Sequence, residues 1–208
     1  MAAPKITCAP NGPYLVAEAP ALRRASGEVL PAAQSFALCR CGGSKKKPFC
    51  DGTHRTNGFS DENRADPAKD KRRTYVGKGV TIYDNRAICA HAAFCTDELA
   101  SVFRHRETPW IAPDAAAVDK IVETIGKCPS GALSYALDGV EAEPPKRAPM
   151  VTVTDNGPYA VTGGIELAGV KFGEGASPEH YTLCRCGASK NKPFCDGSHW
   201  EAGFKDPT

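Results

Sequence analysis

Alternation of hydrophobic and polar residues marks two short segments near the start of the chain and two near its end. The first pair is Ile6–Cys8 and Tyr14–Glu18, and the second is Val151–Thr154 and Tyr159–Thr162. A period of two residues is typical of half-buried β-strands, and the Asn-Gly-Pro sequence inside each pair is a turn signal. The pattern therefore predicts two strand-turn-strand units, each followed by a Gly- and Ala-rich connection.

These two units belong to a longer internal repeat. Residues 6–61 align with residues 151–206 at a constant offset of 145 positions and without an insertion. A domain of this size buries little apolar surface by itself. Each copy therefore needs a bound metal, a partner, or both.

A different segment lies between the copies. Residues 74–85, TYVGKGVTIYDN, alternate like a hairpin. A helix is predicted from Asp114, its N-cap, with an apolar face that runs to Ile125. We expect an α+β chain in which two small, β-rich domains flank an α+β domain. Its predicted domains are residues 1–66, 71–140 and 150–208.

Composition favours a metal-binding protein. Ten cysteines in a chain expected to be cytoplasmic argue for metal ligands before disulfides. The net charge of +2 gives no reason to expect a nucleic acid partner. No apolar run approaches the roughly 18 residues of a membrane helix, and the start lacks a signal-peptide pattern, so we expect no membrane association. No nucleophile elbow or phosphate-binding glycine loop occurs, so we do not expect an enzyme.

The strongest chemical signal is the spacing Cys-x-Cys-x8-Cys-x3-His, which occurs once in each copy. The first occurrence is Cys39, Cys41, Cys50 and His54, and the second is Cys184, Cys186, Cys195 and His199. Three cysteines and a histidine are a common structural zinc set, although zinc sites usually space paired cysteines by two to four residues. A 2Fe-2S cluster has two irons, and a Cys-x-Cys pair on one with a Cys-x3-His pair on the other suits it better.

Around these ligands the chain reads CxCxxSxxxPxCDG(S/T)H twice, which resembles the signature of the CDGSH iron-sulfur domain, the mitoNEET-like family. The resemblance implies that the eight residues are the ligands of two 2Fe-2S clusters. Family members with one such domain are homodimers that share strands. By analogy, the two copies should pair as an intramolecular pseudo-dimer, and the chain should be a monomer with internal pseudo-twofold symmetry.

The middle segment carries a weaker cluster signal. CPSGAL, which begins at Cys128, resembles the Cys-Pro-x-Gly-Ala stretch of bacterial ferredoxins, and Cys89 and Cys95 keep the spacing of two further ligands. Ala92 stands where those proteins have another cysteine, so three thiolates suit a 3Fe-4S cluster. His91 is the nearby candidate for a fourth ligand to a 4Fe-4S cluster. The alternative is a degenerate ferredoxin-like fold without metal.

These sites predict an electron carrier that serves a redox partner protein. A neutral imidazole in place of a thiolate makes a cluster less negative, so we expect a potential above the roughly −400 mV of all-cysteine plant-type ferredoxins. The alternative functions are a 2Fe-2S cluster donor to an apo-acceptor, a redox or iron sensor, and a zinc-type structural adaptor. Lys45, Lys46 and Lys47 either form a solvated loop or steer an acidic partner.

Overall fold

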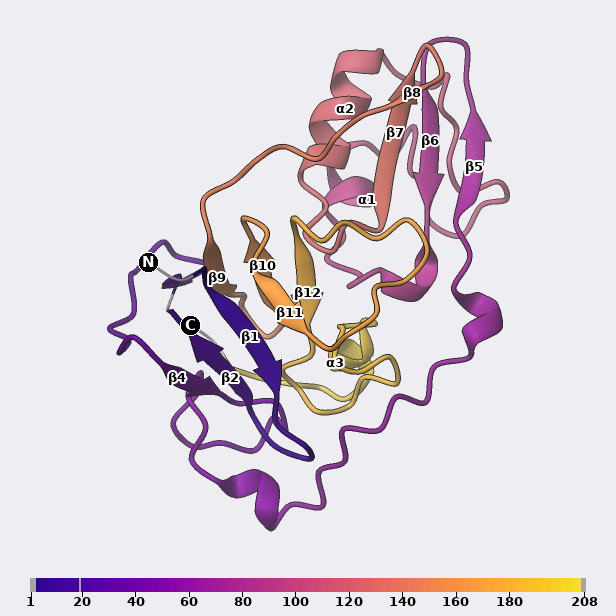
Figure 1. The fold of residues 1–208 in the computed structure, drawn as a ribbon. Helices are drawn as coiled ribbons and strands as arrows, with labels where there is room; N and C mark the ends of the chain where they lie inside the picture. The colour runs from indigo at the N-terminus through magenta and orange to yellow at the C-terminus, as the bar shows by residue number, and fades with distance from the viewer. Residues whose placement is uncertain (1–2, 19, 207–208) are drawn as a thin grey trace.

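A computed structural model describes residues 3–18 and 20–206 of the chain. In this part of the chain the strands form three four-stranded sheets, and helices are few and short. Figure 1 shows two of the sheets side by side and the third, with helices α1 and α2, beyond them. The architecture is therefore a β-rich member of the α+β class. No helix in the described ranges combines the length and apolar character needed to cross a lipid bilayer.

The first repeat contains four strands and one short 3-10 helix. They are β1 (Lys5–Cys8), β2 (Tyr14–Ala17), β3 (Ala21–Arg24), β4 (Phe36–Leu38) and η1 (Thr53–Arg55). The predicted second strand ends one residue early, because Glu18 has a positive φ of 50°.

The second repeat contains the same series of elements. They are β9 (Met150–Val153), β10 (Tyr159–Thr162), β11 (Glu166–Ala168), β12 (Tyr181–Leu183) and the helix α3 (Ser198–Glu201). Strands β3 and β11 fall in the segments predicted to be connections. Each buries one large apolar side chain, Leu22 or Leu167, which is too little alternation to mark a strand in the sequence.

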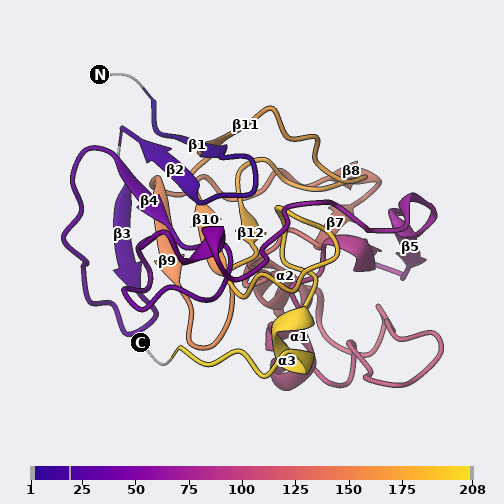
Figure 2. The same cartoon turned by 90° about the horizontal axis from the view of Figure 1, so that it is seen from below.

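These two unpredicted strands join the repeats. Strand β3 of the first repeat pairs in parallel with β9 of the second, and β11 of the second pairs in parallel with β1 of the first. The registers are reciprocal, since Lys5 lies opposite Glu166 and Ala21 lies opposite Met150. Figure 2 shows both pairs at the edges where the two sheets meet. Each of these two sheets thus has three strands from one repeat and one strand from the other.

The two sheets share one hydrophobic core. Tyr14, Leu22 and Leu38 of the first repeat belong to the same buried cluster as Tyr159 and Leu183 of the second. At the centre, the rings of Tyr14 and Tyr159 meet edge to face with centroids 6.1 Å apart. Neither repeat has a separate core, so each depends on the other for burial of its apolar residues.

The middle module forms the third sheet, in the order β5-β6-β7-β8. Its elements are β5 (Arg73–Val76), β6 (Thr81–Asp84), η3 (Arg86–Ile88), α1 (Phe94–Glu98), α2 (Val118–Gly126), β7 (Leu133–Leu137) and β8 (Val140–Glu141). A single turn, η2 (Pro67–Lys69), lies on the connection from the first repeat. The helix predicted from Asp114 begins later, because the Asp114 carboxylate instead accepts the backbone N–H of Lys78 in the β5–β6 turn.

Candidate metal centres

In each repeat, backbone pairing places the ligand cysteines at the end of one strand. Cys39 follows β4, and its N–H donates to the carbonyl of Pro48 at 2.8 Å, while the N–H of Cys50 donates to Ala37 at 2.9 Å. Cys184 and Cys195 make the corresponding bonds to Pro193 and Thr182 at 2.8 and 3.0 Å. The loop between the cysteines is therefore folded back on the strand, and the distant third cysteine comes close to the first two.

The predicted ligands come together as pairs. The Sγ atoms of Cys39 and Cys41 are 3.9 Å apart, and Sγ of Cys50 is 3.5 Å from Nδ1 of His54. In the second repeat, the Cys184–Cys186 distance is 3.8 Å and the distance from Cys195 Sγ to His199 Nδ1 is 3.4 Å. The same paired arrangement therefore occurs twice.

These separations fit two ligands of one tetrahedral metal ion. With metal–sulfur bonds of about 2.3 Å and metal–nitrogen bonds of about 2.0 Å, two thiolates lie about 3.8 Å apart and a thiolate and an imidazole about 3.5 Å. Among the described residues no three His, Cys, Asp or Glu side chains gather about one ion position. The donor set is thus two pairs at each site, which fits a group that contains two metal ions.

Burial disfavours the charged thiolate form of these cysteines unless a cation lies beside them. It raises the pKa of Cys39 to about 11 and raises the pKa of Cys195 strongly. The hydrogen bond between Cys184 and Cys186, together with burial, raises the pKa of Cys184. The same hydrogen bond lowers the pKa of Cys186 to about 7, against the opposing effect of burial. A bound metal supplies the positive charge that such ligands lack, so the environment of the cysteines also fits a metal.

Polar residues that recur in both motifs stabilise the loop. The Asp51 carboxylate accepts the backbone N–H groups of Lys45 and Thr53 and the Thr53 hydroxyl, and these bonds lower the pKa of Asp51 well below its usual range. Ser44 donates its hydroxyl to the carbonyl of Phe49 at 2.7 Å, as Ser189 does to Phe194. These hydroxyls therefore hold the loop in shape from within.

Sequence reasoning missed the arginine between the first two cysteines of each motif. Arg185 is fully buried, donates to the carbonyls of Thr154 and Gly157, and forms an ion pair with Asp206. Arg40 pairs with Asp61 at 3.2 Å in the equivalent position. Each arginine is thus a buried residue whose charge is balanced by an aspartate of its own repeat. The signal was available, since both the arginine and its aspartate recur at the offset of 145.

The two tyrosines of the core connect each metal centre to the opposite repeat. The Tyr14 hydroxyl donates to the carbonyls of Cys184 and Pro193, both at 2.9 Å. The Tyr159 hydroxyl donates to Cys39 and Pro48 at 2.9 and 3.0 Å. Each ligand loop is thus anchored by a residue of the other repeat.

The ligand loops also touch each other directly. A Cβ atom on Gly42 would lie 2.4 Å from the carbonyl oxygen of Cys186, and one on Gly187 would lie 2.7 Å from that of Cys41. Both glycines have positive φ angles, 75° and 81°. Glycine is therefore required twice over at this contact, by backbone conformation and by space.

The three cysteines of the middle module lie on neighbouring elements. Cys89 ends η3, Cys95 lies in α1, and Cys128 follows α2. Burial, followed by the charges of Cys128 and Cys89, raises the pKa of Cys95 to about 11. The three thiols therefore influence one another's ionisation, and their role as ligands of one cluster stays a prediction.

His91, the predicted fourth ligand, lies at the interface with the second repeat. Its ring packs over Gly197, where a Cβ would lie 2.6 Å from the imidazole, and its Nδ1 is 3.4 Å from Arg86. Burial, followed by the charge of Arg86, lowers the pKa of His91. The imidazole thus contacts the second CDGSH-like motif, while the backbone N–H of His91 donates to Sγ of Cys89 at 3.4 Å.

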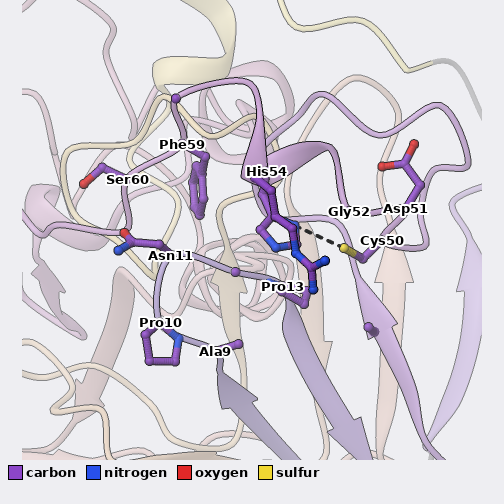
Figure 3. A pocket seen from close by; sticks show the side chains of 14 residues that line it. Ala9, Pro10, Asn11, Pro13, Cys50, Asp51, Gly52, His54, Phe59 and Ser60 are labelled. Carbon is purple, nitrogen blue, oxygen red and sulfur yellow. Dashed lines mark hydrogen bonds between the residues drawn. The ribbon is translucent and has the colours of Figure 1, made fainter.

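The two histidine ligands differ in exposure. His199 is 5% exposed, and the indole of Trp200 lies over its ring with centroids 5.2 Å apart. His54 instead faces a surface hollow of about 1050 Å³. Figure 3 shows its imidazole between Cys50 and Phe59, with the Asp51 carboxylate pointing away. The first centre is therefore the more accessible of the two.

Comparison with protein families agrees with this arrangement. The model described as iron-binding zinc finger, CDGSH type, matches residues 11–55 and again residues 156–200. A model described as divergent 4Fe-4S mono-cluster matches residues 75–138 between them. Each of the three matched segments contains one of the cysteine groups described above.

Among curated proteins, the chain is similar to the uncharacterized protein YjdI of Escherichia coli strain K12. The two are 41% identical over 63 residues, which is 30% of this chain and 83% of YjdI. The YjdI protein of Escherichia coli O157:H7 matches with the same identity and coverage. No solved structure gives a significant match to the chain.

Proposed function

Because the chain belongs to the family of CDGSH-type iron-binding proteins, with two such domains flanking a divergent 4Fe-4S region, we propose that it is an electron-transfer protein. In this proposal each Cys3His set holds one 2Fe-2S cluster. The observation that carries it is the pairing of ligands, Cys with Cys and Cys with His, at the separations of a tetrahedral metal in both repeats.

A cluster bound there supplies one-electron oxidation and reduction. The chain's own residues determine the surroundings of the cluster. Arg40 and Arg185, each the middle residue of a Cys-x-Cys pair, are buried and form ion pairs with Asp61 and Asp206. The hydroxyls of Tyr14 and Tyr159 hold the ligand loops from the opposite repeat. A braced site with little freedom to rearrange favours electron transfer over chemistry that needs open coordination, and we propose no catalytic step for the chain itself.

We also propose that the chain works as a monomer in which the repeats form an intramolecular pseudo-dimer. The reciprocal parallel pairs β1–β11 and β3–β9 support this, as does the shared core. A third cluster is proposed at Cys89, Cys95 and Cys128, of the 4Fe-4S or 3Fe-4S type. The match to the divergent 4Fe-4S region and the effect of the Cys89 and Cys128 charges on Cys95 support it.

A spectroelectrochemical titration tests the proposed function. We expect reversible bleaching and recovery of the visible absorption over repeated cycles, with iron retained. His54→Cys and His199→Cys each replace a neutral ligand with an anionic one, so each should lower the potential of one site toward all-cysteine values. Two reversible waves that do not move in either variant would exclude histidine ligation.

One observation favours a second candidate, a cluster donor or redox sensor. Cys50 and His54 line the surface hollow, so an acceptor has access to that side of the first site. A donor should transfer its iron and sulfide to an apo-ferredoxin and lose its own absorption. Transfer from the intact protein, combined with irreversible electrochemistry, would replace electron transfer as the function.

A further inference from the structure

The middle module covers one face of the second repeat. The side-chain amide of Asn191 donates to the carbonyl of Ala87 at 2.9 Å, and the indole N–H of Trp200 donates to the carbonyl of His91 at 3.2 Å. Between these two contacts the His91 ring lies against Gly197. The covered face is the one that carries Cys195 and His199, and both are buried.

The first repeat presents the equivalent face to solvent. At the positions of Asn191 and Trp200 it has Lys46 and Arg55, which are both exposed. A Cβ on Gly52, the counterpart of Gly197, would meet nothing within 4 Å. The repeats thus share their metal ligands and differ at the two side chains that hold the middle module.

The free face is basic. Arg55 lines the hollow and is exposed, and Lys45 and Lys46 are exposed on the loop that leads to Cys50. Lys47 is turned away, because its Nζ donates to the carbonyl of Ser44 at 2.8 Å and lies over the ring of Phe204. Ion pairs among the described residues engage other cations, such as Arg40 with Asp61. Asp51 is the carboxylate among the residues that line the hollow, and it accepts three hydrogen bonds from Lys45 and Thr53. Figure 3 shows this carboxylate pointing away from His54. A positive field at a surface hollow attracts and orients acidic partners.

From these contrasts we infer that the hollow over Cys50 and His54 is the docking site for the acidic surface of a redox partner protein. The partner occupies on the first repeat the position that the middle module occupies on the second. The exposed lysines and arginine supply charge complementarity, which raises the association rate and orients the encounter without a large interface. This inference rests on the proposed function, since it assigns a partner to the same site.

The repeat provides a matched pair of variants. Lys45 and Lys190 are equivalent residues, both are exposed, and Lys45→Glu and Lys190→Glu change the net charge equally. The probe is a fluorescein-labelled oligo-glutamate peptide, and its binding to the iron-loaded full chain is measured by fluorescence anisotropy. The salt concentration is about 10 mM, where screening extends over about 30 Å.

We expect Lys45→Glu, Lys46→Glu and Arg55→Glu each to weaken binding about fivefold, the equivalent of one ion pair of about 1 kcal/mol. Lys190→Glu should stay within about twofold of the unmodified chain. Hydrogen exchange with the peptide bound should slow in residues 45–60 and not in residues 190–205. Equal losses from Lys45→Glu and Lys190→Glu, or no binding at low salt, would overturn the docking site.

Iron content and the visible spectrum are recorded on the same samples. If the protein holds its iron but Lys45→Glu and Lys190→Glu weaken peptide binding equally, the docking inference is refuted and the proposed function still stands. Protein without iron refutes the proposed function itself. A variant is compared only when its iron content equals that of the unmodified chain, which excludes misfolding as the cause of weaker binding.

Discussion

Single residues couple the two metal centres, and the tyrosine hydroxyls show this most directly. Tyr14 and Tyr159 are fully buried, and each donates to two carbonyls of the opposite ligand loop. A buried carbonyl that loses its donor costs about 1–3 kcal/mol. Substitution of either tyrosine should therefore weaken metal retention at the centre of the other repeat.

Tyr14→Phe should accelerate iron loss from the second centre, and Tyr159→Phe from the first. Iron release to a chelator is followed by absorbance. We expect two phases in the unmodified chain, with the slower one from the covered centre of His199. Tyr181→Phe is the control, because its buried hydroxyl donates to Ile165 outside the ligand loop. Acceleration of the same phase by Tyr14→Phe and Tyr159→Phe would contradict the crossed anchoring.

Gly42→Ala should destabilise the chain much more than Gly27→Ala. Both glycines have positive φ, which costs alanine about 1–2 kcal/mol. Only Gly42 faces a backbone oxygen at 2.4 Å from the added methyl group, while Gly27 faces open space. Overpacking adds about 1–3 kcal/mol at Gly42. Denaturant unfolding of both variants measures the difference, and equal losses would mean that the two loops do not touch.

At the scale of elements, strands β3 and β11 decide how the chain is assembled. Each pairs in parallel with a strand of the other repeat, and neither pairs with another strand of its own repeat. The first repeat alone would leave β3 without a partner and would expose the core face of Tyr14 and Leu22. Apolar faces and strand edges of this kind promote association.

Residues 1–70 expressed alone should therefore form a homodimer and not a folded monomer. The registers of β1–β11 and β3–β9 are reciprocal, so two copies of the first repeat can exchange β3 in the same way. Light scattering after gel filtration measures the mass. Leu22→Lys, which places a charge in the shared core, should abolish the dimer and its iron. A stable, iron-loaded monomer would show that exchange is not needed for folding.

Much of the site, and less of the fold, was readable in the sequence. The ligands recur at one fixed offset with a spacing that metal chemistry explains, so Cys39 to His54 and their counterparts could be grouped without a structure. The resemblance indicated that the two repeats pair, but the strands that they exchange could not be identified, because β3 and β11 are short and bury one large residue each. Their stability comes from partner strands more than a hundred residues away in the sequence. The local hydrophobic pattern contains no information about such distant partners. Asp114 looked like a helix cap but serves the β5–β6 turn.

At the scale of the whole molecule, the middle module makes two similar centres unequal. It contacts Gly197 and Trp200 of the second repeat and leaves the hollow at His54 open. In Figure 1 the long connection after the first repeat runs outside the second repeat before it reaches β5. On this path Arg64 donates its N–H to Lys190 at 2.7 Å, which fastens the connection beside the covered face.

Trp200→Arg, which copies the residue of the first repeat, should expose the second centre. It removes the ring that lies over His199 and the hydrogen bond to His91. We expect the slow phase of iron release to approach the rate of the fast phase. The reciprocal change, Arg55→Trp, is the control and should leave the slow phase unaltered. An unchanged slow phase in Trp200→Arg would show that the indole does not protect the centre.

The central claim is that the two Cys3His sets each hold a 2Fe-2S cluster, and metal analysis tests it most directly. Iron, zinc and acid-labile sulfide are measured on anaerobically purified protein in which Cys89, Cys95 and Cys128 are serine. The claim predicts about four iron atoms and about four sulfides per chain, with visible absorption and no zinc. Two zinc ions per chain in a colourless protein without sulfide would contradict it.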